Sequence, residues 1–290
     1  MLKMVILSRQ PQLYANQRLI AAAKLRECDI TVLDPLQIPV LLSGQCPAND
    51  SLNCRFDAII PRYGPTWQRQ GNALLSYWQN QGAISLNNAQ AIALARDKFQ
   101  CLTVFARNGV PFPKSASCES IAAAENLLAN EFIFPVLTKQ NSSAQGRGVE
   151  RFFDSETALA RMAQLFSLNE PFLIQEFIAE ANGADRRLFI VNGQLLAAMK
   201  RTAATGDFRS NVHQGGHAKA YQASPEEIEL ALNAVSLLGL DVAGVDIIHS
   251  ARGPLLLEVN ACPGFEALER DSGVDIDGKM MDFLISKKKP

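Results

Sequence analysis

GPLLLEVNACPGFE, residues 253–266, has the composition of a buried strand that carries polar groups at its end. Three leucines, Leu255 to Leu257, lead directly to Glu258 and Asn260. Side chains alternate across a strand, so Glu258 and Asn260 share one face. Since an unpaired buried charge is costly, these two oxygen-bearing side chains require a partner.

The preceding stretch VAGVDIIHS, residues 242–250, predicts the other strand of a hairpin. If the hairpin centres near Arg252, Asp246 lies directly opposite Glu258 on the same face. Two close carboxylates repel, and a hard divalent cation such as Mg²⁺, which prefers oxygen ligands, relieves that repulsion. We therefore expect a metal site at Asp246, Glu258 and Asn260. The alternative is a half-exposed strand on which Glu258 faces water.

Composition indicates an ordinary soluble globular protein. The 290 residues are 48% hydrophobic with a formal net charge of −1, which gives no support for a nucleic-acid-binding body. The six cysteines form no Cys-x-x-Cys pair, so neither a zinc site nor a disulfide framework is indicated. The N-terminal apolar stretch is too short for a signal peptide and no run approaches a membrane span, so we expect a cytoplasmic protein.

Three units are expected along the chain. Residues 1–90 alternate short apolar runs with helical patterns, which predicts a parallel sheet covered by helices. No Gly-x-Gly-x-x-Gly motif follows the first run, so a dinucleotide site is not expected. Residues 88–109 have the pattern of one long helix that ends at Gly109. Two α+β units follow, at 91–174 and 175–290, and the fold class is therefore α/β.

Two other segments offer cationic or backbone groups. Lys139 ends an apolar strand and precedes a loop with Gly146 and Gly148, whose small residues let backbone N–H groups approach phosphate oxygens. The loop lacks the Walker pattern, and a plain hairpin tip is the alternative. In DFRSN, Arg209 and Asn211 can hold an oxyanion or a carboxylate, or can lie in a surface loop.

In chain order, LARDK, GDFRSN, GVDI and RGPLLLEVNACPGFE resemble the ATP-grasp superfamily, and most closely the RimK-like α-L-glutamate ligases. The resemblance covers nearly the whole chain, and GDFRSN together with EVNxxPG is its most specific part. It implies an ATP-grasp fold with ATP held between the last two units. It also implies that ATP phosphorylates an acceptor carboxylate to an acylphosphate, which the amine of L-glutamate then attacks.

The resemblance further implies roles for single residues. Lys98 and Lys139 would neutralise phosphate oxygens, and Arg209 would stabilise the acylphosphate and the tetrahedral intermediate. Two Mg²⁺ or Mn²⁺ ions would bind Asp246, Glu258 and Asn260. The expected ATP-binding residues are Lys98, Lys139, Gly146, Gly148, Glu176, Phe177, Asp185, Arg209, Ser210 and Asn211, with Arg209 and Lys139 as the catalytic pair.

Three residues depart from the pattern of that family. Ser143 stands where a glycine is frequent, Arg147 where a small apolar residue is frequent, and Cys262 where a serine is frequent. The first two lie in the loop after Lys139 that the resemblance assigns to phosphate binding.

The implied partners are ATP, L-glutamate and an acidic acceptor, such as the C-terminus of a ribosomal protein or a small molecule. Arg62, Arg209 and the Arg186–Arg187 pair suit the recognition of carboxylates. Neither nucleic acid nor a membrane is expected as a partner, and a symmetric homo-oligomer would be ordinary. Two alternatives remain: a ligase for another amino acid or peptide, and a non-catalytic ATP-binding module.

Overall fold

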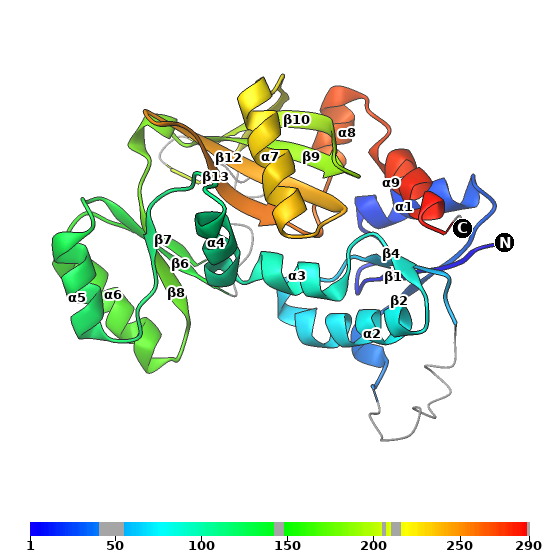
Figure 1. Cartoon of the computed structure of the whole chain (residues 1–290), viewed down its shortest axis with the longest axis horizontal. Helices are drawn as coiled ribbons and strands as arrows, with labels where there is room; N and C mark the ends of the chain where they lie inside the picture. Colours follow the sequence, from blue (N-terminus) through cyan, green and yellow to red (C-terminus); the bar gives the residue numbers. More distant parts are fainter. Residues whose placement is uncertain (41–54, 142–147, 205–206, 210–215, 289–290) are drawn as a thin grey trace.

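The structure, a computed structural model of the whole chain, describes residues 1–40, 55–141, 148–204, 207–209 and 216–288. The strands within these ranges form three sheets (Figure 1). The helices are α1 (Tyr14–Lys24), α2 (Gln68–Asn80), α3 (Ala89–Arg96), α4 (Lys98–Arg107), α5 (Ile121–Asn130), α6 (Ser155–Ser167), α7 (Pro225–Leu237), α8 (Glu266–Ser272) and α9 (Ile276–Ser286), with short 3₁₀ turns at Pro35–Gln37, Pro65–Trp67 and Ala179–Ala181.

The first sheet confirms the predicted parallel α/β unit. Its strands are β1 (Lys3–Leu7), β2 (Asp29–Leu33), β3 (Ala58–Pro61) and β4 (Ile84–Ser85), and they pair in the order β2-β1-β3-β4, all in parallel. The central strands β1 and β3 are apolar because both faces of a parallel sheet are covered.

The other two sheets are antiparallel. A four-stranded sheet has the order β5-β8-β6-β7 and packs on α5 and α6, which lie at the left end of the molecule in Figure 1. A five-stranded sheet has the order β11-β10-β9-β12-β13. These strands are β5 (Ser115–Ala116), β6 (Val136–Gln140), β7 (Val149–Phe152), β8 (Phe172–Glu176), β9 (Ala184–Val191), β10 (Gln194–Thr202), β11 (His217–Ala220), β12 (Val242–Ser250) and β13 (Gly253–Asn260).

The five-stranded sheet has helices on both faces. Leu188, Val245 and Val259 pack on the α7 side, in a core that continues into the first unit. On the other face, Phe189 and Met199 pack against α8 and α9, whose core also includes α1. Buried cores thus extend from the first unit into the third, and the boundaries placed after residues 90 and 174 stay predictions.

The predicted single helix over 88–109 is wrong, because the helix is interrupted at Asp97. Asp97 is extended (φ −85°, ψ 99°), and its side chain accepts a hydrogen bond from the Gln100 amide at 3.0 Å. An aspartate at this position caps a new helix and ends the previous one. Lys98 thereby becomes the first residue of α4. Gly109, with a φ of 68°, follows the end of α4 as expected.

The two long hairpins of the five-stranded sheet are β9–β10 and β12–β13. In each of them, one strand contains one residue more than its partner strand. In β13, Leu256 pairs with Ile247 and Glu258 pairs with Asp246, so Leu257 is unpaired. In β10, a similar shift leaves Leu196 unpaired between two residues that face β9. A β-bulge of this kind shifts all later residues of the strand by one position relative to the partner strand.

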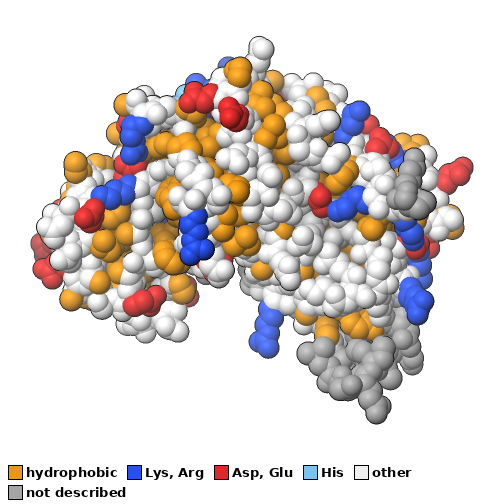
Figure 2. All heavy atoms as spheres, in the orientation of Figure 1, with side chains coloured by type: hydrophobic (Ala, Val, Ile, Leu, Met, Phe, Trp, Pro, Cys, Tyr) orange, Lys and Arg blue, Asp and Glu red, His pale blue; other side chains and the backbone are white. Residues whose placement is uncertain are grey.

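The surface shows no single-sign field on the face drawn in Figure 2, where acidic and basic side chains are interspersed. This distribution agrees with the formal net charge of −1. Among the described helices, none combines the length and the apolar character needed to cross a bilayer.

Candidate active site

A row of charged residues crosses three neighbouring strands of the five-stranded sheet. Arg187 on β9 stands opposite Asp246 on β12, which stands opposite Glu258 on β13. Directly opposed residues of antiparallel strands share a face. The predicted opposition of Asp246 and Glu258 is therefore confirmed.

A buried ion-pair network holds Asp246 in this row. Arg187 donates to both Asp246 oxygens, each at 2.7 Å. Arg201 on β10 donates to both Asp185 oxygens at 2.6 Å and to Asp246 Oδ2 at 2.8 Å. Burial alone would raise the pKa of Asp246, but the two guanidiniums outweigh it and hold that pKa below its usual range.

The residues at the end of β13 fit a hard divalent cation. Glu258 is exposed, and Asn260 is half-buried beside it. In the orientation that satisfies both neighbours, the Asn260 amide nitrogen donates to Glu258 at 3.0 Å and its oxygen accepts from Arg187 at 3.1 Å. With Asp246 the set offers two carboxylates and an amide oxygen, which are ligands that Mg²⁺ prefers. Within the chain, Arg187 and Arg201 supply the positive charge next to Asp246.

A cavity lies between the four-stranded and the five-stranded sheet, and it contains most of the predicted site. Leu137 and Leu173 form part of its apolar wall on one side, and Leu256 on the other. The predicted residues that line the cavity are Lys98, Lys139, Glu176, Phe177, Asp185, Arg209, Asp246 and Glu258. Gly148, with a φ of 69°, directly precedes β7 at the loop end of the β6–β7 hairpin. Gly146, Ser210 and Asn211 lie outside the described residues, as do Ser143 and Arg147.

The two predicted phosphate-binding lysines approach the cavity from different elements. Lys139 is on β6, directly opposite Val149 of β7. Lys98 begins α4, and its Nζ donates to the Asn141 carbonyl at 3.2 Å, next to the end of β6. Burial lowers the pKa of Lys139 to about 8, and nearby Glu258 offsets only part of this effect. An ammonium group held here without a bound anion is therefore destabilising.

Replacing Lys139 by methionine is expected to stabilise the ligand-free protein by roughly 2 kcal/mol near neutral pH, since each unit of pKa shift corresponds to about 1.4 kcal/mol. The unfolded chain holds the Lys139 proton up to a higher pH than the folded chain. The gain should be full below pH 8 and shrink as pH rises toward the unfolded value. Urea unfolding without ATP at several pH values measures it, with exposed Lys219→Met as control. A pH-independent gain would contradict the assignment.

The remaining predicted residues already have partners within the chain. The Glu176 amide donates to the Lys114 carbonyl at 2.9 Å, so this amide is engaged. Phe177 packs edge-to-face on Phe208, with the ring centroids 5.8 Å apart. Arg209 donates to the Asp207 carboxylate through Nε and Nη2, at 3.1 Å and 3.0 Å. The Nε and Nη2 groups of Arg209 are therefore engaged by a carboxylate of the same chain.

Arg201 is a site residue that the sequence analysis missed. It stands opposite Asp185 in the hairpin that turns at Asn192-Gly193. A regular hairpin through that turn places Ala184 opposite Arg201, and the unpaired Leu196 changes this pairing to Asp185. The signal in the sequence is an arginine at the end of the strand, which is uninformative unless the bulge is known.

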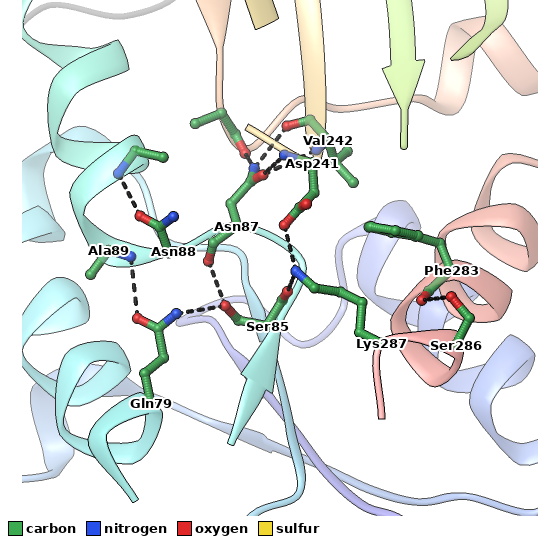
Figure 3. Close-up of polar contacts among 12 residues, drawn as sticks. Gln79, Ser85, Asn87, Asn88, Ala89, Asp241, Val242, Phe283, Ser286 and Lys287 are labelled. Carbon is green, nitrogen blue, oxygen red and sulfur yellow. Dashed lines mark hydrogen bonds and ion pairs between the residues drawn. The ribbon is translucent and has the colours of Figure 1, made fainter. Parts of the chain in front are cut away.

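Asn87 supports the end of β13 from the first unit (Figure 3). Its Nδ2 donates to the carbonyls of Val242 (2.7 Å) and Ala261 (2.6 Å), and its Oδ1 accepts from the amides of Asp241 (2.7 Å) and Val242 (3.0 Å). Ala261 directly follows Asn260. One fully buried side chain therefore fixes the strand end that carries the candidate metal ligands.

Asn87→Ala is expected to lower the free energy of unfolding by about 3 kcal/mol, because it leaves several buried backbone groups without a partner. The neighbouring Asn88 caps α3 through the Ala91 amide at 2.7 Å. Asn88→Ala should cost only about 1 kcal/mol, as is typical of a lost helix cap. Urea unfolding of both variants measures the difference, and equal losses would contradict the role given to Asn87.

The chain matches known families and proteins over nearly its whole length. Residues 2–92 match the RimK PreATP-grasp domain, and residues 95–284 match the RimK-like ATP-grasp domain. A protein of Aeromonas salmonicida named "Probable alpha-L-glutamate ligase" is 38% identical over 287 residues, which cover 98% of this chain and 96% of that protein.

Solved structures share the fold. A RimK domain protein ATP-grasp from Sphaerobacter thermophilus superposes with a TM-score of 0.79 at 23% identity, covering 98% of this chain and 99% of that one. The ATP-grasp ligase PsnB, complexed with minimal precursor, Mg and ADP, superposes with a TM-score of 0.72 at 21% identity, covering 99% and 98%. At such identities the likeness extends to the fold alone.

Proposed function

The chain belongs to the RimK-like ATP-grasp family, and from this premise we propose that it joins the amine of L-glutamate to a carboxylate of an acidic acceptor, using ATP. The observation that carries the proposal is the row of Arg187, Asp246 and Glu258, whose two carboxylate residues line a largely apolar cavity. Lysines from two separate elements reach the same cavity. Phosphate groups are the ligand chemistry that such a combination suits.

The reaction has two steps. An oxygen of the acceptor carboxylate attacks the γ-phosphorus of ATP, the bond from that phosphorus to the β-phosphate oxygen breaks, and ADP leaves. The glutamate nitrogen then attacks the carbonyl carbon of the acylphosphate and loses a proton, and the bond from that carbon to the phosphate oxygen breaks. An amide bond and inorganic phosphate result.

The residues of the chain supply position and charge for both steps. Lys98 and Lys139 bind phosphate oxygens, and Arg209 binds the acylphosphate and the oxyanion that forms when the amine attacks. A divalent cation held by Asp246, Glu258 and Asn260 offsets charge on the phosphates when it is bound. We also propose that two divalent cations bind rather than one. A cytoplasmic location and a symmetric homo-oligomer are further parts of the proposal.

One assay tests the proposed function. The purified protein is incubated with ATP, Mg²⁺, L-glutamate and N-acetyl-diglutamate as acceptor probe, and also with peptides that end in glutamate, including a ribosomal protein C-terminus. We expect phosphate release together with a product heavier by one glutamate residue. Turnover with a different amino acid alone would replace glutamate in the proposal. ATP binding without turnover in any mixture would favour a non-catalytic module.

A further inference from the structure

Two arginines, Arg62 and Arg96, meet at the carboxyl edge of the parallel sheet. Arg62 directly follows β3, and Arg96 is the last residue of α3. Arg62 Nη1 donates to the Pro263 carbonyl at 2.6 Å. Arg96 Nη2 donates to the Tyr63 carbonyl and to Cys262 Sγ, the latter at 3.4 Å. Both guanidiniums therefore contact the segment that follows β13.

Among the described residues, neither guanidinium has an acidic partner. Within the ranges that the structure describes, no aspartate or glutamate forms an ion pair with Arg62 or Arg96. Buried N–H groups at Arg62 Nε and Arg96 Nη1 have no hydrogen-bond partner there either. Burial lowers the pKa of Arg62, and the charge of Arg96 lowers it further. Two like charges so placed cost free energy unless an anion joins them.

The arginine pair lies beside the reaction site. In open α/β sheets, ligands bind outside the carboxyl ends of the strands, and Arg62 stands at such an end. Arg96 is separated only by Asp97 from Lys98, which lines the ATP cavity. Cys262, which Arg96 contacts, comes two residues after the candidate metal ligand Asn260. An anion bound by this pair would thus lie next to the edge of the sheet where metal and phosphate are proposed to bind.

We propose that Arg62 and Arg96 bind a substrate carboxylate that takes no part in the reaction. The planar guanidinium fork matches a carboxylate, and charge-assisted hydrogen bonds of this kind are strong. The inference rests on the proposed function, because both L-glutamate and an acceptor rich in glutamate carry such unreacted carboxylates. The two sources share one chemistry, and binding of each can be measured separately.

The test measures binding rather than turnover. Protein loaded with Mg²⁺ and a non-hydrolysable ATP analogue is titrated calorimetrically with glutarate, with L-glutamate and with N-acetyl-diglutamate. Arg62→Met and Arg96→Met should weaken glutarate binding by roughly 10- to 100-fold, as expected for the loss of charge-assisted hydrogen bonds. Arg107→Met, at the exposed end of α4, is the matched control and should bind glutarate like the wild type. Affinity for the ATP analogue should stay unchanged in all three variants.

The outcomes distinguish between the two sources of the carboxylate and can also overturn the proposal. A weaker L-glutamate affinity assigns the pair to the incoming amino acid, and a weaker N-acetyl-diglutamate affinity assigns it to the acceptor. Wild-type affinity for all three probes in both variants, or no glutarate binding by the wild type, overturns the proposal. If the methionine variants unfold, Arg62→Lys and Arg96→Lys keep the charge but lose the fork, and should show the same loss. Carboxylate binding that depends on the pair, without glutamate ligation, would refute the proposed function but not this site.

Discussion

Glu258→Gln is expected to lower kcat by more than about 100-fold, since even residues that only support metal ligands cost 10- to 100-fold when they are removed. The substitution keeps the size of the side chain and removes a full negative charge at the end of β13. Glu258 is exposed and pairs only with the Asn260 amide among the described residues, so the fold should be retained. The loss should therefore be one of cation affinity and rate, and not of folded protein.

Steady-state kinetics as a function of Mg²⁺ concentration, together with thermal unfolding, measures this result. The concentration of Mg²⁺ that gives half-maximal rate should rise in the variant. Glu229→Gln is the matched control, because Glu229 is exposed on α7, which covers the opposite face of the sheet. Wild-type kcat and an unchanged Mg²⁺ requirement in Glu258→Gln would rule out Glu258 as a metal ligand.

Arg201→Met is expected to lower the free energy of unfolding by about 3–5 kcal/mol, the usual effect of removing one partner from a buried ion pair. Arg201 is 3% exposed and is shared by Asp185 and Asp246, which are 4% and 3% exposed. Without Arg201, Asp185 loses the two bonds from its buried cation, while Asp246 still has Arg187. The burial of Asp185 should therefore become more unfavourable than that of Asp246.

Urea unfolding of three variants tests the role of Arg201. Lys200→Met changes an exposed residue on the same strand and should alter stability by less than about 0.5 kcal/mol. Adding Asp185→Asn to Arg201→Met should recover part of the loss, because the buried carboxylate that has lost its two Arg201 bonds is then removed. A cost for Arg201→Met as small as that for Lys200→Met would show that the network contributes little to stability.

Apolar runs and turn residues predicted most strands of the three sheets, because burial and alternation act within a few residues. The edge strands β5 and β11 were not predicted. They also predicted that Asp246 faces Glu258. The break at Asp97 was missed since residues 88–109 keep a helical pattern throughout, and only the capping geometry reveals that Asp97 is extended. The role of Arg201 depends on the bulge at Leu196, and the role of Arg96 depends on the packing of α3 against the segment after β13. Neither feature is contained in the local patterns of the sequence.

The unpaired Leu257 in β13 determines where the β12–β13 hairpin can gain or lose a residue. Loss of one residue between the turn and Glu258 would remove the bulge, and Glu258 would still stand opposite Asp246. Loss of Val259 would instead place Asn260 opposite Val245 and turn its amide toward the core beneath α7. Insertions and deletions among homologous chains should therefore accumulate on the turn side of Glu258 and be absent between Glu258 and Asn260.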